Sequence, residues 1–367
     1  MSRMITAAGL AAGLLLSTIS ADAGTLIPVP PVSGSTGTFI GGINDKNQIT
    51  GDYTTSDGNL HGFVGTLDGQ YTSFDFPGGQ TSVSRIDNKG FITGLGNTQT
   101  EDCQTFGCQY LRDPDGTVEG ITKAGVPLDG IPEGIIGHAR YVGQYSYYDG
   151  TILWFYGYYG RGTKYRSDLS LPFNTQRTSP RGYRKDGTVV GYFRDIDHGN
   201  ESTGFILQNG IATAVNYPDP SAFYTFLEDV NDSGIVSGYW LSSDQQTSQA
   251  FLYDLNSQTF SPIEFDGASS VYIRAINRHD VVAVEIDNAP YIYCTNDRKC
   301  PLSPSRGVKI AVKSIPATPS SVRSVTCKNG CTGPSHANGM AADPAAVRAA
   351  IAQDPDLDRP VHLAYRR

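Results

Sequence analysis

Short apolar runs alternate with polar turns along most of the chain. One pattern recurs: an apolar anchor residue, a turn rich in Asn, Asp and Gly, and then alternating apolar residues. Its clearest copies are INDKNQITGDY from Ile43, IDNKGFITGLG from Ile86 and VNDSGIVSGYW from Val230. Asn, Asp and Gly tolerate the backbone angles of tight hairpins, and apolar residues at every second position are typical of β-strands. Each copy therefore predicts a strand, a turn and a second strand.

Three weaker copies share this frame and start at Ile135, Tyr183 and Ile276. The anchors lie between 43 and 49 residues apart and define units 1 to 6 in chain order. In the first five units a Gly follows eight positions after the anchor, whereas unit 6 has Val284 there. This regular spacing is the signature of a repeat architecture.

A second hairpin follows the anchor hairpin, as in GFVGTLDGQYTSFDFPG from Gly62 and GFILQNGIATAVNYPDP from Gly204. Four short strands in about 47 residues is the length of a propeller blade. We therefore predict an all-β, six-bladed β-propeller over residues 24–300. A β-solenoid, whose coils are usually shorter, and a β-sandwich are the alternatives.

The repeat resembles the HAF-type bacterial extracellular repeats, whose units carry an I-N-x-x-G-x-V-x-G-Y core followed by a G-F-L strand. The similarity covers residues 43 to about 294 and is best at Val230–Tyr239 followed by Ala250–Leu252. Unit 3 lacks the Asn, and unit 4 has Arg184 in its place. The resemblance implies an exported repeat fold and no particular activity.

Unit 6 ends after an aromatic strand at Pro290–Cys294 and lacks a fourth strand. The N-terminal segment Thr25–Pro30 resembles Thr72–Pro77, which is the fourth strand of unit 1. Open strand edges invite aggregation, so a ring has to close. We therefore expect Thr25–Val29 to pair beside Pro290–Cys294.

Residues 1–23 have the features of a secretory signal peptide. Arg3 precedes an apolar run from Ile5 to Leu16, and Ala21-Asp22-Ala23 is an A-x-A cleavage site. The apolar run is too short to span a bilayer comfortably as a membrane anchor. We expect cleavage after Ala23, a secreted or periplasmic protein, and no membrane span in the mature chain.

The C-terminal part departs from the repeat. Residues 301–340 are rich in Ser, Pro and Gly and predict an irregular segment. Residues 341–367 predict a short helix from Asp343 to about Gln353, capped by Asp with Pro at its first position, and a polar tail.

The six cysteines form three close pairs, which in an exported protein favours disulfides. We expect local pairing, although six cysteines allow 15 connectivities. A metal site is disfavoured because no C-x-x-C occurs and no His lies at ligand spacing from a pair. The expected pairs are Cys103–Cys108, Cys294–Cys300 and Cys327–Cys331.

The formal net charge is −8 and is unevenly distributed. Residues 24–300 hold 18 Lys and Arg against 31 Asp and Glu, whereas residues 301–367 hold nine against four. An acidic body argues against nucleic acid as a partner. The basic tail is either solvated or in contact with an acidic surface, for instance that of the protein's own body.

The sequence lacks G-x-S-x-G, P-loop, G-x-G-x-x-G and H-E-x-x-H motifs, so we predict no catalytic residue, metal or cofactor. One set of charged residues nevertheless follows the repeat. The residues two positions before the anchors are Gly41, Ser84, Glu133, Arg181, Glu228 and Arg274. The last four alternate in sign, and equivalent positions in neighbouring blades are close in space.

Two interpretations of Glu133, Arg181, Glu228 and Arg274 remain open. The first, which we favour, is a seam of salt bridges between successive blades. The expected pairs are Glu133–Arg181, Arg181–Glu228 and Glu228–Arg274. The second is a polar funnel that holds a carboxylate or a sugar acid through its two arginines.

Tyr145 is a further candidate for ligand binding. It belongs to a segment from Tyr141 to Tyr165 that contains eight tyrosines, and Tyr rings on loops bind sugars and peptides well. The alternative, that these are ordinary strand positions, is the one we favour. Together these features predict a non-enzymatic binding or scaffold module for an unknown ligand, for instance a glycan or peptide. The alternative is a hydrolase or lyase, such as a lactonase-like enzyme, with a central polar pocket.

Overall fold

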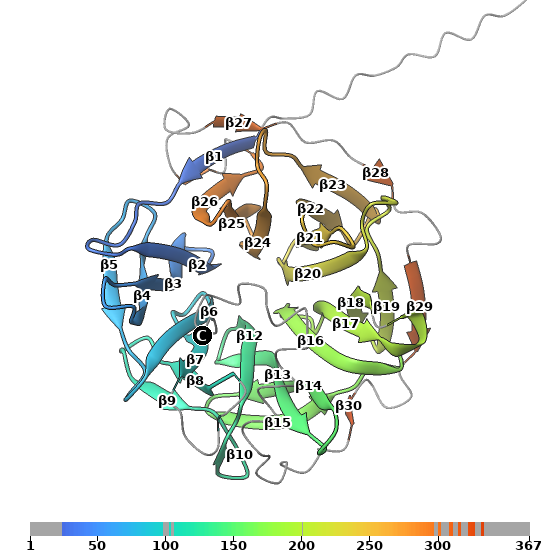
Figure 1. Cartoon of the computed structure of the whole chain (residues 1–367), viewed down its shortest axis with the longest axis horizontal. Coiled ribbons are helices and arrows are strands. Elements are labelled where there is room, and N and C mark those ends of the chain that lie inside the picture. Colours follow the sequence, from blue (N-terminus) through green and yellow to red (C-terminus); the bar gives the residue numbers. More distant parts are fainter. Residues whose placement is uncertain are drawn as a thin grey trace, which may run out of the picture.

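The computed structural model describes residues 24–97, 103, 106–199, 201–296, 300–301, 308–310, 315–316, 322–326 and 332–333. These residues form β-strands arranged around a central axis, together with one 3₁₀ turn, η1 (Ile196–His198) (Figure 1). The first strand of each unit lies nearest the axis and the last lies at the rim. The expected all-β, propeller-like fold is thereby confirmed.

The strands follow the repeat. Unit 1 forms β2 (Gly37–Ile43), β3 (Gln48–Thr54), β4 (Leu60–Thr66) and β5 (Tyr71–Phe74). Unit 2 forms β6 (Gln80–Ile86), β7 (Ile92–Asn97), β8 (Cys108–Arg112) and β9 (Val118–Gly120). Unit 3 forms β12 (Gly130–Ile136), β13 (Arg140–Tyr148), β14 (Leu153–Arg161) and β15 (Lys164–Leu169), preceded by β10 (Thr122–Lys123) and β11 (Val126–Pro127).

The remaining units follow the same plan. Unit 4 forms β16 (Thr175–Tyr183), β17 (Val189–Asp195), β18 (Glu201–Gln208) and β19 (Ile211–Val215). Unit 5 forms β20 (Tyr224–Val230), β21 (Ile235–Leu241), β22 (Ser248–Asp254) and β23 (Thr259–Ile263). Unit 6 forms β24 (Val271–Ile276), β25 (Val281–Ile286) and β26 (Ala289–Cys294).

Within each unit, successive strands of the repeat pair antiparallel. Hydrogen bonding groups the described strands into five sheets, two of four strands, two of five and one of twelve. The twelve-stranded sheet contains units 3 and 4. A single parallel pair, Phe155 opposite Arg177, connects the two units.

The N-terminal strand β1 (Gly24–Pro28) closes the ring, as predicted. It lies antiparallel beside β26, with Thr25 opposite Cys294 and Pro28 opposite Tyr291, and the Val29 amide donates to the Pro290 carbonyl at 3.0 Å. In Figure 1 the blue start of the chain therefore lies next to the orange strands of unit 6. The first strand thus completes the last unit.

Segment 301–340, which we expected to be irregular, contributes short strands to the rim: β27 (Val308–Ile310), β28 (Ile315–Pro316), β29 (Val322–Thr326) and β30 (Thr332–Gly333). They pair antiparallel with β1, β23, β19 and β15, which are the outer edges of units 6, 5, 4 and 3. The segment therefore runs backwards around the circumference and covers edges that would otherwise be unpaired. The helix expected after Asp343 lies outside the described residues.

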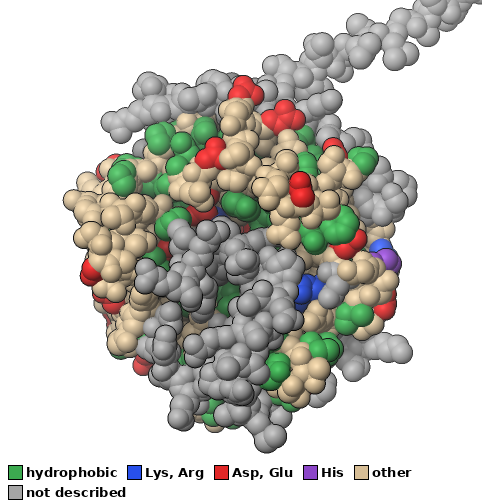
Figure 2. Space-filling view, viewed as in Figure 1, with side chains coloured by type: hydrophobic (Ala, Val, Ile, Leu, Met, Phe, Trp, Pro, Cys, Tyr) green, Lys and Arg blue, Asp and Glu red, His purple; other side chains and the backbone are tan. Residues whose placement is uncertain are grey.

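Contact between the basic tail and the acidic body is observed in β29. The Arg323 guanidinium lies 2.8 Å from the buried Asp195 carboxylate and 4.9 Å from the centre of the Phe173 ring. On the face shown in Figure 2, acidic side chains of the described residues are spread over several places.

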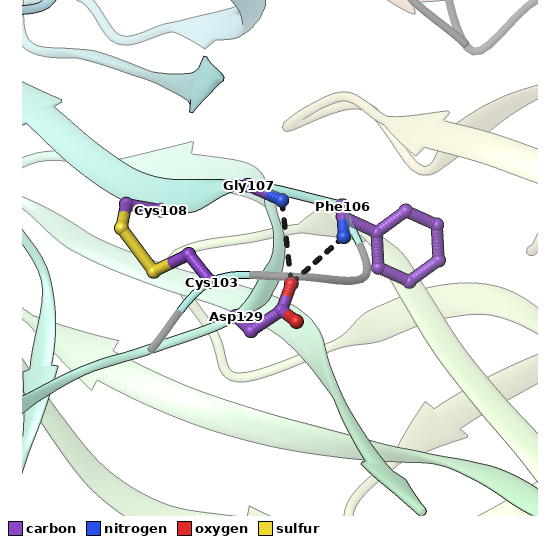
Figure 3. Close-up of a disulfide and its surroundings, with 5 residues drawn as sticks. All are labelled: Cys103, Phe106, Gly107, Cys108 and Asp129. Atoms are coloured by element: carbon purple, nitrogen blue, oxygen red, sulfur yellow. Dashed lines mark hydrogen bonds between the residues drawn. A yellow bond between two sulfur atoms is a disulfide. The ribbon is translucent and has the colours of Figure 1, made fainter. Parts of the chain in front are cut away.

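Two of the three expected disulfides, Cys103–Cys108 and Cys294–Cys300, are present. The Asp129 carboxylate accepts hydrogen bonds from the amides of Phe106 (2.8 Å) and Gly107 (3.3 Å), so the loop closed by the first disulfide is attached to the segment that enters unit 3 (Figure 3). The second disulfide starts at the buried end of β26, beside the closing strand. The pair Cys327–Cys331 lies outside the described residues.

The hydrophobic core lies between units. One cluster joins Ile40 and Phe63 of unit 1 to Ala283 and Ile292 of unit 6, and another joins Val142 of unit 3 to residues of unit 4. A sheet covered on both faces buries nearly all of its central strands. This explains why β17 and β25 are buried along their whole length.

The repeated Gly has a steric cause. In every unit the first strand contains a β-bulge, and in units 1 to 5 the Gly lies opposite the residue just before that bulge. A Cβ at Gly51 or Gly191 would collide with the backbone carbonyl of Phe39 or Ser179 on the paired strand. Unit 6 accommodates Val284 at this position, opposite Ile273.

The Asn after the anchor has two functions. The Oδ1 atom of Asn44 accepts the amides of Lys46 and Gln48, both at 3.0 Å, and so holds its own turn. Its Nδ2 donates at 3.0 Å to the carbonyl of Asp87, which occupies the same position in unit 2.

The same bond recurs further around the ring. Asn231 donates to the carbonyl of Asn277 at 3.0 Å, and Asn277 donates to that of Asn44 at 3.1 Å. The motif residue therefore connects neighbouring units and also connects unit 6 to unit 1.

Unit 2 lacks this donor because Asp87 replaces the Asn. Its Oδ1 holds the turn through the amides of Lys89 (2.8 Å) and Phe91 (3.0 Å). Its Oδ2 is buried and has no hydrogen-bond partner among the described residues, and burial raises the pKa of the carboxyl. Asp87 and Asn44 are equivalent residues of the repeat. The Oδ2 atom of Asp87 therefore corresponds to the Nδ2 atom with which Asn44 donates to the next unit.

We predict that Asp87→Asn increases the free energy of unfolding at neutral pH by about 1 kcal/mol, because it supplies the missing donor and removes a buried charge. The gain should shrink in acid, where a protonated Asp87 is itself a donor. Urea unfolding measures the effect. Asn44→Asp is the matched control and should destabilise the protein; a stabilising Asn44→Asp or a destabilising Asp87→Asn would contradict this account.

Candidate functional site

The candidate site is built by the β-bulges of the first strands. The register shifts between Pro132 and Ile135, between Pro180 and Gly182, between Leu227 and Asp229, and between Ile273 and Ala275. A bulge interrupts the alternation of side chains and redirects the extra residue. The residues in these bulges include Glu133, Arg181, Glu228 and Arg274, the four charged residues that the repeat singled out.

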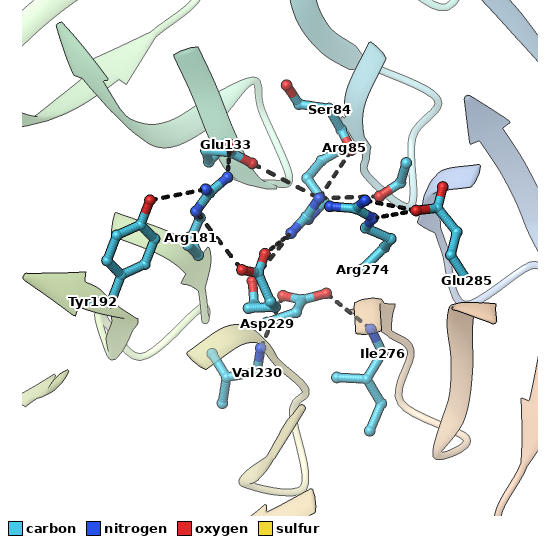
Figure 4. Close-up of polar contacts among 12 residues, drawn as sticks. Ser84, Arg85, Glu133, Arg181, Tyr192, Asp229, Val230, Arg274, Ile276 and Glu285 are labelled. Atoms are coloured by element: carbon cyan, nitrogen blue, oxygen red, sulfur yellow. Dashed lines mark hydrogen bonds and ion pairs between the residues drawn. The ribbon is translucent and has the colours of Figure 1, made fainter. Parts of the chain in front are cut away.

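Four charged residues, Arg85, Glu133, Arg181 and Glu228, form a closed cycle of ion pairs that we call the axial cycle (Figure 4). Arg85 lies 3.7 Å from Glu133 and 3.4 Å from Glu228. Arg181 contacts Glu133 directly and lies 4.0 Å from Glu228. Each charge therefore has two partners of opposite sign, and the cycle is neutral.

The axial cycle is shielded from solvent. The two glutamate side chains are 3% exposed, those of Arg85 and Arg181 7% and 11%. Burial alone would lower the pKa of Arg181, but Glu133 and Glu228 outweigh it and hold this pKa above its usual range. Removing one partner of such a buried pair typically costs about 3–5 kcal/mol, because it leaves an unpaired charge.

Two of the three pairs expected from the sequence, Glu133–Arg181 and Arg181–Glu228, are present. Arg274 binds Glu285 of its own unit, through Nε at 3.0 Å and Nη2 at 2.6 Å, in place of the expected Glu228. Burial lowers the pKa of Arg274, but the negative charge of Glu285, with a smaller contribution from Glu228, outweighs burial and raises this pKa.

Arg85, which our sequence analysis missed, closes the cycle. It follows the bulge of unit 2 and also donates to the carbonyls of Gly41 (3.0 Å) and Glu228 (3.1 Å). The equivalent residues of the other units are Gly42, Gly134, Gly182, Asp229 and Ala275. A long cation in a row of mostly small residues was the signal that would have identified it.

Small residues are needed there because neighbouring first strands touch through their backbones. A Cβ at Gly134 would lie 2.6 Å from the carbonyl oxygen of Arg181, and one at Gly182 would lie 2.7 Å from the Cα of Asp229. The units therefore converge at the axis, and the side chains in the bulges are brought together.

Asp229 is the other exception in this row. Its carboxylate accepts the amides of Val230 at 2.8 Å and Ile276 at 3.0 Å, which links units 5 and 6 (Figure 4). Burial raises its pKa to about 6, against the lowering effect of Arg85 and these amides. The paired groups of the axis are already neutral, so an ionised Asp229 adds an uncompensated charge.

Tyr145, the fifth candidate, lies in a different environment. It is 3% exposed on β13 and packs in the cluster that contains Tyr141 and Tyr158. Its hydroxyl donates to Asp168 at 2.9 Å, and the ammonium of Lys123 lies 4.3 Å from the centre of its ring. These tyrosines occupy strand positions, as in the interpretation we favoured, and Tyr145 is not part of the axial cycle.

Among the described residues, no group of three or more His, Cys, Asp and Glu side chains is arranged to hold a metal ion. No helix in this part of the chain is long and apolar enough to cross a membrane.

No protein-family model matches the chain, and no curated protein matches it. A comparison with solved structures finds chains of low similarity. A streptogramin B lyase is 14% identical, with coverage of 74% of this chain and 97% of that one and a TM-score of 0.43. The Aleuria aurantia lectin is 11% identical, with coverage of 79% and 99% and a TM-score of 0.47. A putative gluconolactonase is 9% identical, with coverage of 80% and 94% and a TM-score of 0.42.

These similarities transfer no activity to this chain. The class that the described strands define is an all-β, propeller-like repeat protein with two disulfides.

We predict that Asp229 makes the folded state more stable in mild acid. Its folded pKa of about 6 lies above the ordinary 3.8, so the folded protein binds this proton more tightly. The stability that this proton contributes is fully present below a pH of 3.8, the ordinary pKa, and is lost as the pH rises through about 6. Between about pH 7.5 and 4.5 the parent should gain about 2 kcal/mol relative to Asp229→Asn.

Urea unfolding across this pH range tests the effect. The exposed Asp266→Asn serves as the control and should keep the pH dependence of the parent. Parallel stability curves for the parent and Asp229→Asn would show that Asp229 does not titrate in this range.

Proposed function

We propose that this protein is an exported, six-bladed propeller that acts as a non-enzymatic binding or scaffold module at the cell surface or in the periplasm. Export is supported by the A-x-A site that ends at Ala23, directly before the start of β1 at Gly24, so cleavage there leaves the closing strand intact. The two disulfides also suit an oxidising compartment.

The number of blades follows from counting one blade for each repeat unit. The twelve-stranded sheet then holds two blades, because units 3 and 4 each keep their own four-stranded order within it. Contacts of β2 with both β24 and β6 support a ring in which unit 6 is followed by unit 1.

One observation carries the proposal of binding without catalysis: the charges at the axis neutralise one another. A catalytic carboxylate or an arginine that binds substrate needs free hydrogen-bonding capacity toward the substrate. Here Arg181 pairs with two glutamates and Arg274 pairs with Glu285. Neither of the two arginines that a polar funnel would use to hold a sugar acid is therefore free to do so. We therefore interpret the axial cycle as a seam and expect glycans or peptides to bind elsewhere on the surface.

The experiment compares binding and turnover in the same preparations. The exported protein, its Arg85→Met variant and a control with an exposed lysine replaced, Lys46→Met, are incubated with panels of glycans, peptides, lactones and esters. We expect a saturable thermal shift with a glycan or peptide and no turnover. Arg85→Met should lower the melting temperature and leave the affinity for that ligand unchanged.

Two results would overturn the proposal. One is turnover of a lactone or ester that Arg85→Met abolishes and Lys46→Met retains, since this would make the axis an active site. The other is an intact mass of the exported chain that shows residues 1–23 still attached.

A further inference from the structure

Arg177 differs from the arginines of the axis. It lies on β16 of unit 4, is 1% exposed, and its guanidinium is between two aromatic rings. The centre of the Phe155 ring is 4.8 Å from the guanidinium carbon, and that of Tyr192 is 5.3 Å away. Phe155 belongs to unit 3, so this guanidinium fills the junction of two units.

Only one edge of this guanidinium is engaged within the described residues. Its Nε donates to Oε1 of Gln144 at 3.2 Å, whereas Nη1 and Nη2 are buried without a hydrogen-bond partner. The Nε2 atom of Gln144, on the same amide group, also lacks a partner. The Gln144 backbone is fixed in turn, because its carbonyl accepts a hydrogen bond from Gln109 at 3.1 Å.

Ser179 adds a further free group. Within the described part of the chain its fully buried Oγ has no hydrogen-bond partner. Ser179 lies two residues after Arg177 on the same strand, in a stretch of regular register. Alternation along a strand places residues two apart on the same face. Buried groups that can donate a hydrogen bond therefore gather around a cation, without an acceptor for them in the described part of the chain.

The charge makes this arrangement costly unless it is compensated. An arginine stays protonated in proteins, so burial cannot neutralise it as it neutralises a carboxyl group. Arg85, Arg181 and Arg274 each have a glutamate partner. The attraction of facing aromatic rings is smaller than the cost of burying an unpaired charge.

We propose that Arg177, Gln144 and Ser179 bind a small monovalent anion between units 3 and 4. The free edge of the guanidinium supplies the charge and two donors, and the Gln144 amide and the Ser179 hydroxyl supply one each. Because Arg177 is 1% exposed, the site is enclosed, and the ligands we propose are small ions, a halide or formate. None of these three residues belongs to the axial cycle, although the Tyr192 ring contacts both Arg177 and Arg181. The site does not depend on the proposed binding function.

The test is thermal unfolding in a gluconate buffer, with gluconate replaced stepwise by bromide or by formate at constant ionic strength. The melting temperature of the parent should rise saturably, because a ligand that binds only the folded state stabilises it. Arg177→Met should lose the response, and Lys46→Met, which removes an exposed positive charge, should keep it. Comparing bromide with formate distinguishes a halide site from a carboxylate site.

A second variant guards against misfolding of Arg177→Met. Gln144→Leu keeps the guanidinium and removes one donor, so its half-saturating concentration should rise severalfold. A crystal grown in bromide should show anomalous scattering next to the Nη atoms of Arg177. The proposal is overturned if the parent does not respond to either anion, or if Arg177→Met or Gln144→Leu responds as the parent does.

Discussion

Close approach of the first strands around one axis is the constraint on which the rest of the structure depends. Gly134 and Gly182 let neighbouring strands touch through their backbones, which leaves no room for a Cβ. Each of these strands also carries a bulge at the same place, and the redirected side chains include Glu133, Arg181 and Glu228. Buried charges brought this close together have to neutralise one another.

The axial cycle satisfies this requirement and specifies how the ring is assembled. Arg85 of unit 2 reaches Glu133 in the next unit and Glu228 in unit 5, so it connects blades that are not neighbours. Buried ion pairs contribute little net stability compared with apolar residues, but a wrong pairing leaves charges unpaired. Directly after the first strands, the Asn bonds from Asn231 through Asn277 to Asn44 fix the order of neighbouring units.

Much of this arrangement could be predicted from the sequence because the repeat gives equivalent residues equivalent places. The anchor frame led to Glu133, Arg181 and Glu228, and the lack of a fourth strand in unit 6 led to its pairing with β1. Arg85 was missed because its side chain crosses the axis from the neighbouring position of the repeat. Arg274 was assigned the wrong partner because the frame did not show Glu285 opposite it in the same hairpin. The strands β27 to β30 form because they pair with the outer edges of the units. The local composition of this segment does not reveal that such an edge lies beside it.

The most direct test of the axial cycle is a double-mutant cycle of Arg85→Met and Glu228→Gln, measured by urea unfolding. The two residues are 143 positions apart in sequence, in units 2 and 5, and interact only if the ring is assembled as described. We predict a coupling energy of at least about 1 kcal/mol. Effects that add to within about 0.3 kcal/mol would contradict the claim that Arg85 and Glu228 interact across the axis.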